Sequence, residues 1–66
     1  MYIVEVEGFD GNTRIFDMAD VDKEKNLENA VEYAQKTKKR CVENGLDIKI
    51  TVEERYYDYK KVVLTL

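Results

Sequence analysis

The chain has 66 residues, of which 38% are charged and 44% hydrophobic, and its net charge is −3. These values are typical of a small folded domain and exclude a disordered tail or the apolar run of ~18 residues that a membrane span needs. A single cysteine and no histidine or serine exclude an internal disulfide, a structural zinc site and the Ser-His and Cys-His catalytic arrangements. We therefore expect residues 1–66 to form one domain that is not an enzyme and needs no cofactor or metal.

The first predicted strand runs from about Met1 to Glu7, where apolar and acidic residues alternate. One face carries Tyr2, Val4 and Val6, and the other carries Ile3, Glu5 and Glu7. Because this segment has neither the basic start nor the apolar centre of a signal peptide, we expect a cytoplasmic protein, in its own cell or in a host cell.

The second predicted strand spans Thr13 to Met18 and follows a glycine-containing turn at residues 8–12. A two-residue turn would place Phe16 opposite Glu5. A three-residue loop at 9–11 instead gathers the large apolar side chains on one face, so we prefer it. The pairs that this loop predicts are Val4 with Phe16 and Tyr2 with Met18.

A long helix is predicted from an N-cap at Asp22 or Asn26 to about Asn44. Asn44-Gly45 supplies the left-handed position that ends a helix, and Leu46 is expected to fold back on Cys41 in a Schellman motif. Apolar residues at three- and four-residue steps form the predicted buried stripe: Leu27, Ala30, Val31, Ala34, Cys41 and Val42. On this stripe, Cys41 is interpreted as a buried and unreactive thiol.

The last two predicted strands, Asp47 to Arg55 and Tyr59 to Leu66, form a second hairpin. A three-residue loop at 56–58 pairs Ile48 with Leu66, Ile50 with Leu64, Val52 with Val62, Glu54 with Lys60 and Glu53 with Lys61. The resulting ββαββ order predicts an α+β fold, with a four-stranded, mainly antiparallel sheet and one long helix on one face. Because residues 62–64 are apolar on both faces, we expect the last strand beside the first, in the order 2-1-4-3.

Acidic residues dominate the first part of the chain, with nine acids and three bases in residues 1–32, against five acids and eight bases in residues 33–66. Asp20-x-Asp22-x-Glu24 resembles the start of a calcium loop, but Lys25 and Val31 stand where that loop needs glycine and glutamate. We therefore interpret the acids as a candidate surface for a basic partner. Its members are Glu5, Glu7, Asp17, Asp20, Asp22 and Glu24.

A second candidate surface lies on the sheet face that one helix cannot cover. Four apolar or aromatic residues are expected there, with two further tyrosines at the rim, and together they would form a patch for a protein partner. The residues are Ile3, Ile15, Tyr59 and Val63, with Tyr56 and Tyr57 at the rim.

The leading hypothesis is a non-catalytic protein that binds another macromolecule, with a protein as the expected partner, through the acidic surface and the tyrosine-bearing hairpin. Small acidic chains of this kind are common among phage and mobile-element inhibitors of host defence (anti-CRISPR-like). One alternative is a nucleic-acid-binding module in which Lys36, Lys38, Lys39 and Arg40 contact phosphates and the tyrosines stack on bases, although a net negative charge disfavours it. Others are a ligand-sequestering dimer, and a designed or orphan domain without a binding function. We also expect a homodimer and no membrane association.

Overall fold

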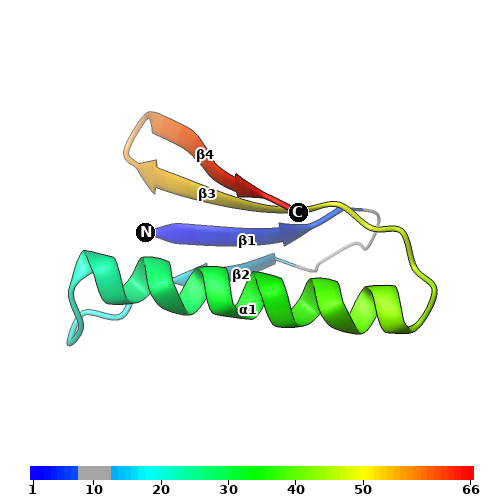
Figure 1. The fold of residues 1–66 in the computed structure, drawn as a ribbon. Helices are drawn as coiled ribbons and strands as arrows, with labels where there is room; N and C mark the ends of the chain where they lie inside the picture. The colour runs from blue at the N-terminus through cyan, green and yellow to red at the C-terminus, as the bar shows by residue number, and fades with distance from the viewer. Residues whose placement is uncertain (8–12) are drawn as a thin grey trace.

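The computed structural model describes residues 1–7 and 13–66 and has the predicted ββαββ order (Figure 1). Its elements are β1 (Tyr2–Val6), β2 (Thr13–Phe16), α1 (Lys23–Glu43), β3 (Ile50–Tyr56) and β4 (Tyr59–Thr65). All neighbouring strands are antiparallel, and α1 lies along one face of the sheet. The predicted α+β fold is therefore confirmed, whereas the predicted turn at 9–11 lies outside the described residues. In the described ranges, no helix is long and apolar enough to cross a membrane.

The strand order is β2-β1-β3-β4, so the predicted order 2-1-4-3 is wrong. The strand beside β1 is β3, whose Ile50 and Val52 are completely buried. In β4 the register shifts by one residue, so that Val63 and Leu64 both pack against the core while Val62 is 51% exposed. The apolar run at 62–64 therefore reflects a bulge in an edge strand and not a strand that is buried on both faces.

The register predicted for the β3–β4 hairpin is also wrong, because the turn has two residues, Tyr57 and Asp58. Tyr57 has a φ of 49°, which lets the chain reverse in fewer residues than predicted. The bulge then brings apolar residues opposite one another again farther along the strands. The observed pairs are Tyr56 with Tyr59, Arg55 with Lys60, Glu54 with Lys61, Glu53 with Val62, Val52 with Leu64 and Thr51 with Thr65.

The β1–β2 hairpin is displaced by two residues from the preferred register. The observed pairs are Tyr2 with Phe16, Ile3 with Ile15, Val4 with Arg14 and Glu5 with Thr13. Because successive side chains point to opposite faces, a shift of two residues leaves each side chain on its predicted face. Phe16 therefore still packs toward the core, whereas Met18 lies beyond the strand and is exposed.

The helix begins and ends at the predicted signals. Asp22 is the N-cap, and its carboxylate accepts a hydrogen bond of 2.8 Å from the third helical N–H group. Gly45 has a φ of +73°, and Leu46 N donates to the Cys41 carbonyl at 2.9 Å, as a Schellman motif requires. Both ends of α1 are therefore set by residues next to them in the sequence.

The core lies between α1 and the sheet and consists of Tyr2, Val4, Val6, Ala30, Ala34, Ile48, Ile50 and Val52. The two alanines let the helix backbone approach the sheet closely. The predicted stripe is wrong at Val42, which is exposed because it lies about 80° around the helix axis from Ala34. The predicted burial of Cys41 is only partial, since its side chain packs against the edge of the core.

Candidate functional site

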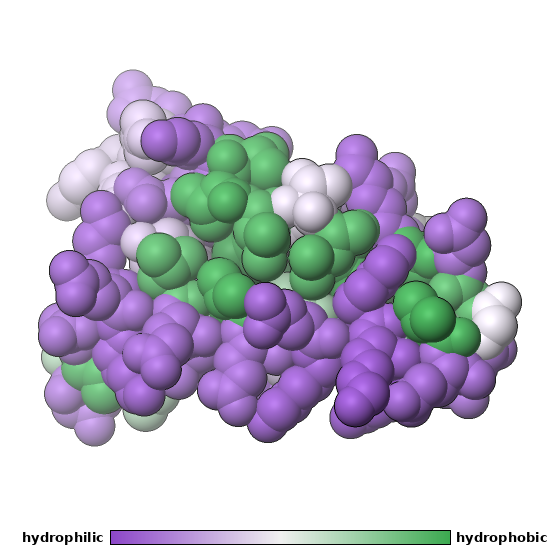
Figure 2. Space-filling model, in the orientation of Figure 1, coloured by the Kyte–Doolittle hydropathy of each residue, from purple (hydrophilic) through white to green (hydrophobic). Residues whose placement is uncertain are grey.

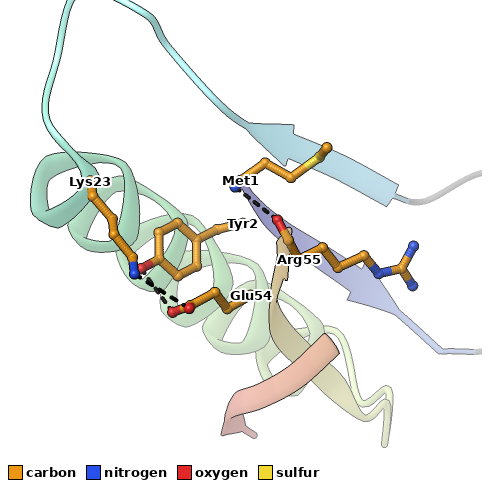
Figure 3. Close-up of polar contacts among 5 residues, drawn as sticks. All are labelled: Met1, Tyr2, Lys23, Glu54 and Arg55. Atoms are coloured by element: carbon orange, nitrogen blue, oxygen red, sulfur yellow. Dashed lines mark hydrogen bonds and ion pairs between the residues drawn. The ribbon is translucent and has the colours of Figure 1, made fainter. Parts of the chain in front are cut away.

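Three polar side chains converge where the start of α1 meets the end of β3 (Figure 3). The Tyr2 hydroxyl donates to Glu54 Oε2 at 3.2 Å, and Lys23 Nζ lies 3.4 Å from Glu54 Oε1. The Lys23 ammonium also lies 4.9 Å from the centroid of the Tyr56 ring. These contacts join β1, α1 and β3 and hold the β3–β4 turn beside the first turn of the helix.

The ionisation of this cluster is consistent with a structural role. Burial raises the pKa of Tyr2, and the Glu54 carboxylate that accepts its hydrogen bond raises it further. The pKa of Lys23 is also raised: partial desolvation acts to lower it, but the hydrogen bond to Glu54 and the charge of that carboxylate outweigh this effect. At neutral pH the cluster is therefore a neutral phenol and a charged lysine that share one carboxylate.

The β3–β4 turn presents three aromatic side chains, which we call the tyrosine tip: Tyr56, Tyr57 and Tyr59. Tyr56 and Tyr59 are directly opposite one another and partly exposed. Tyr57 is fully exposed and has a φ of 49°, the only positive φ of a non-glycine residue in the described ranges. The sequence predicted Tyr56 and Tyr57 in the hairpin loop and Tyr59 at the start of the last strand, and the structure brings the three together.

Next to the tip lies the connection between β2 and α1, and a buried asparagine shapes it. Met18 N donates to Asn26 Oδ1 at 3.1 Å, and Asn26 Nδ2 donates to the Met18 carbonyl at 3.2 Å. A hollow of about 250 Å³ between this connection and the sheet is lined by residues that include Asp17, Lys23 and Tyr56. The sequence offered Asn26 as an alternative N-cap, and that alternative is wrong, because Asp22 is the N-cap and Asn26 instead binds the Met18 backbone.

The structure splits the predicted acidic surface in two. Four of its members lie in the connection or the first turn of α1, near the tyrosine tip, and we call them the helix-start acids: Asp17, Asp20, Asp22 and Glu24. Glu5 and Glu7 lie toward the other end of β1, where they line a shallow hollow of about 360 Å³ together with Lys49 and Lys60. Only the helix-start acids therefore share a surface with the tyrosines.

The sheet face opposite α1 carries charge. The Glu53 side chain is only 8% exposed, and its Oε2 accepts hydrogen bonds from Arg55 Nε at 3.1 Å and Nη2 at 2.9 Å. Lys60 Nζ lies 3.6 Å from the other carboxylate oxygen. This ion-pair network occupies the centre of the face on which an apolar patch was expected.

The four residues predicted for that patch do not form it. Ile3 is buried, and its neighbour Ile15 is 60% exposed at the β2 edge. Val63 packs against the core because of the bulge. Tyr59 pairs with Tyr56, whose ring contacts Lys23 of α1, so Tyr59 belongs to the helix side of the sheet.

The basic run of α1 is separate from the tyrosine tip. Lys36 pairs with Glu32 at 2.8 Å, and Lys38 donates to the Ile48 carbonyl. The exposed members of the run are Lys36, Lys39 and Arg40. Tyr56 contacts α1 at Lys23, and a helix rises about 20 Å over the thirteen residues from there to Lys36. The residues proposed for nucleic-acid binding therefore do not form one continuous surface.

Neither metal-binding chemistry nor comparison with known proteins indicates a function for the described residues. In residues 1–7 and 13–66, no three acidic or cysteine side chains are grouped in a way that could hold a metal ion. Comparison of the chain with protein-family models, with curated proteins and with solved structures finds no significant match. The geometry of the surface is therefore the guide to function.

Proposed function

We propose that this protein is a non-catalytic binding module that contacts another protein through the tyrosine tip and the adjacent helix-start acids. The observation that carries the proposal is the state of Tyr57, which is fully exposed with a φ of 49°. A left-handed backbone costs an L-residue about 1–2 kcal/mol. The free chain recovers none of this cost through packing of the ring, whereas a partner with an apolar pocket would.

The tip has the properties of an interface anchor. Tyrosine offers a large, stiff surface with one polar end, and it is enriched among the residues that dominate binding energies. The backbone below the tip is held in place, because Tyr56 lies against Lys23 and the neighbouring Glu54 is bound by Lys23 and Tyr2. A partner would therefore meet a pre-organised hairpin, which lowers the entropic cost of binding.

The charge beside the tip favours a basic partner surface. Of the cations beside the tip, Lys23 is paired with Glu54, and Lys61 stands opposite the same glutamate. Arg55 and Lys60 are both paired with Glu53, whereas the helix-start acids lie at the same end of the molecule. Acidic groups at the rim of an interface mainly increase the association rate with a positively charged partner. This arrangement suits an inhibitor that occupies a basic groove of its target, including the inhibitors of host defence that phages and mobile elements encode.

Differential capture tests the proposal. The native chain, a Tyr57→Gly variant and a Val42→Ala control would be immobilised at equal density and exposed to a lysate of the cells that produce the protein. We expect a protein that the native chain and the control retain and that Tyr57→Gly loses at least ~10-fold, because glycine accepts the turn geometry but removes the ring. The proposal fails if every captured protein binds the native chain and Tyr57→Gly equally.

The contribution of charge is tested on the same partner. An Asp20→Asn variant should slow association and reduce its dependence on salt, while the dissociation rate stays nearly unchanged. An equal association rate for Asp20→Asn and the native chain at low salt would remove the helix-start acids from the proposed interface.

A further inference from the structure

The two outer edges of the sheet differ in length. One edge is β2, with four residues, and the other is β4, with seven residues and no proline. Ile50 and Leu66 exchange backbone hydrogen bonds of 3.1 and 2.8 Å, so Thr65, one position earlier, directs its own N–H and C=O groups away from β3. No strand pairs with that side of β4 in the described ranges. A long edge of this kind is a template for another strand.

An apolar strip lies beside this edge on the helix side of the sheet. α1 packs on β1, β2 and β3, which leaves Leu64 and Leu66 only partly covered. Lys38 reaches the Ile48 carbonyl just before β3, so Leu27 and Val31, on the same side of the helix, lie toward the β3–β4 side of the sheet. Figure 2 shows the resulting apolar surface between the β3–β4 hairpin and the hydrophilic outer side of α1.

We propose that a second copy of this chain binds along β4, strand to strand and antiparallel, with the two-fold axis between Val62 and Val63. This register places Val62 opposite Val63 of the second copy, Lys61 opposite Leu64 and Lys60 opposite Thr65. No lysine faces another lysine, and the two valines at the axis meet apolar partners. A two-fold interface of this kind is self-complementary, and it also extends the apolar strip of each copy.

The distribution of charge favours a second copy of this chain as the partner that binds along β4. β4 starts at the tyrosine tip beside the helix-start acids, and it ends near Ile48, where Lys38 of the basic run is bound. Antiparallel pairing therefore turns the acidic end of each copy toward the basic end of the other. Because the dimer is two-fold symmetric, this complementarity occurs twice.

This inference goes beyond the proposed function and does not depend on it. In the antiparallel dimer the two tyrosine tips lie at opposite ends and remain exposed. A variant at Tyr57 should therefore leave dimerisation unchanged, and a variant in the β4 edge should leave each tip intact.

The register is tested by disulfide trapping in chains that also carry Cys41→Ser. A Lys60→Cys chain and a Thr65→Cys chain would be mixed and oxidised, and the mixture should give a covalent dimer, because antiparallel opposite residues lie about 5 Å apart. Each chain alone should cross-link far less, since the same residue in two copies is separated by five strand positions, about 16 Å. Equal cross-linking of the single chains and the mixture would overturn the register.

Light scattering at micromolar concentrations tests whether the chain is a dimer and whether the β4 edge forms the dimer interface. The native chain should have about twice its 7.8 kDa chain mass. Thr65→Pro should weaken dimerisation at least ~10-fold, because it removes an outward N–H group without removing a bond to β3, whereas Thr65→Ala keeps that group and serves as the control. A monomeric native chain, or a Thr65→Pro chain that dimerises like Thr65→Ala, would overturn the proposal.

Discussion

The β1–β2 hairpin lies under α1 along both strands, whereas the β3–β4 hairpin is covered only along β3 (Figure 1). On the β2 side, the Phe16 and Tyr33 rings pack with centroids 5.7 Å apart, and the Arg14 guanidinium lies over both rings at 5.4 and 4.9 Å. A helix about 10 Å wide cannot cover four strands spaced about 4.8 Å apart. Because the aromatic pair draws α1 toward β2, the strand left open is β4.

The two hairpins therefore have different roles. The β1–β2 side closes the core with aromatic and cationic side chains, and the β3–β4 side presents the features on which both proposals rest, namely the tyrosine tip, the apolar strip and a long free edge. The following changes test how far the two sides differ, from the largest expected effect to the smallest.

The largest contrast should come from equivalent truncations in the two hairpins. Ile50→Ala in β3 removes a completely buried side chain and should lower the free energy of unfolding by about 2–5 kcal/mol. Ile15→Ala in β2 truncates a side chain that is mostly exposed and should change it by less than ~0.5 kcal/mol. Urea unfolding monitored by circular dichroism measures both. Similar losses for the two variants would show that the core extends to the β2 edge.

A substitution at the hairpin tip should instead stabilise the chain, because the left-handed backbone of Tyr57 is unfavourable. Tyr57→Gly should raise the free energy of unfolding by about 0.5–1 kcal/mol, since relief of the left-handed φ exceeds the extra freedom that glycine gains when unfolded. Thermal unfolding measures the effect, and Tyr59→Ala, which changes a neighbouring tyrosine without this backbone geometry, is the control. A loss of stability for Tyr57→Gly would mean that the ring packs in the free chain.

Loss of the aromatic contact on the β2 side should have an effect of similar size and opposite sign. Arg14→Ala removes a guanidinium that lies over Phe16 and Tyr33 and should cost about 0.5–1 kcal/mol. Arg14→Lys is the control, because an ammonium keeps the charge but stacks less well on a ring. If chemical denaturation gives equal stabilities for the native chain, Arg14→Ala and Arg14→Lys, the position of α1 does not depend on this stack.

The smallest effect is a pH dependence on the β3 side. The pKa of Tyr2 is raised in the folded chain, so the folded state holds this proton more tightly than the unfolded state. The resulting stability is present below the ordinary tyrosine pKa of 10.0 and is lost as the pH rises through the folded value. Tyr2→Phe should therefore flatten the alkaline decline of the melting temperature. An unchanged alkaline profile for Tyr2→Phe would assign the decline to other groups.

Part of the candidate site could be predicted from sequence. The tyrosines were placed at a hairpin loop, because alternating strands on either side of them leave no other position for residues 56–58. The acidic surface was predicted as a unit because its members are close in sequence. In the structure, β1 carries Glu5 and Glu7 away from the helix start, and the length of α1 separates the basic run from the tip. Distance along the chain did not indicate distance in space.

The sequence by itself determined the features that depend on neighbours within a few residues. Asp22 caps α1, and Gly45 and Leu46 end it. The alternation of β1, β2 and β3 assigns the two faces of each strand, even where the register moved by two residues. The tertiary structure decided the two-residue turn at Tyr57, the bulge at Val63, the central position of β3 and the ion pairs around Glu53. These features depend on which strand gains most from burial under a single helix, and that competition involves residues far apart in the chain.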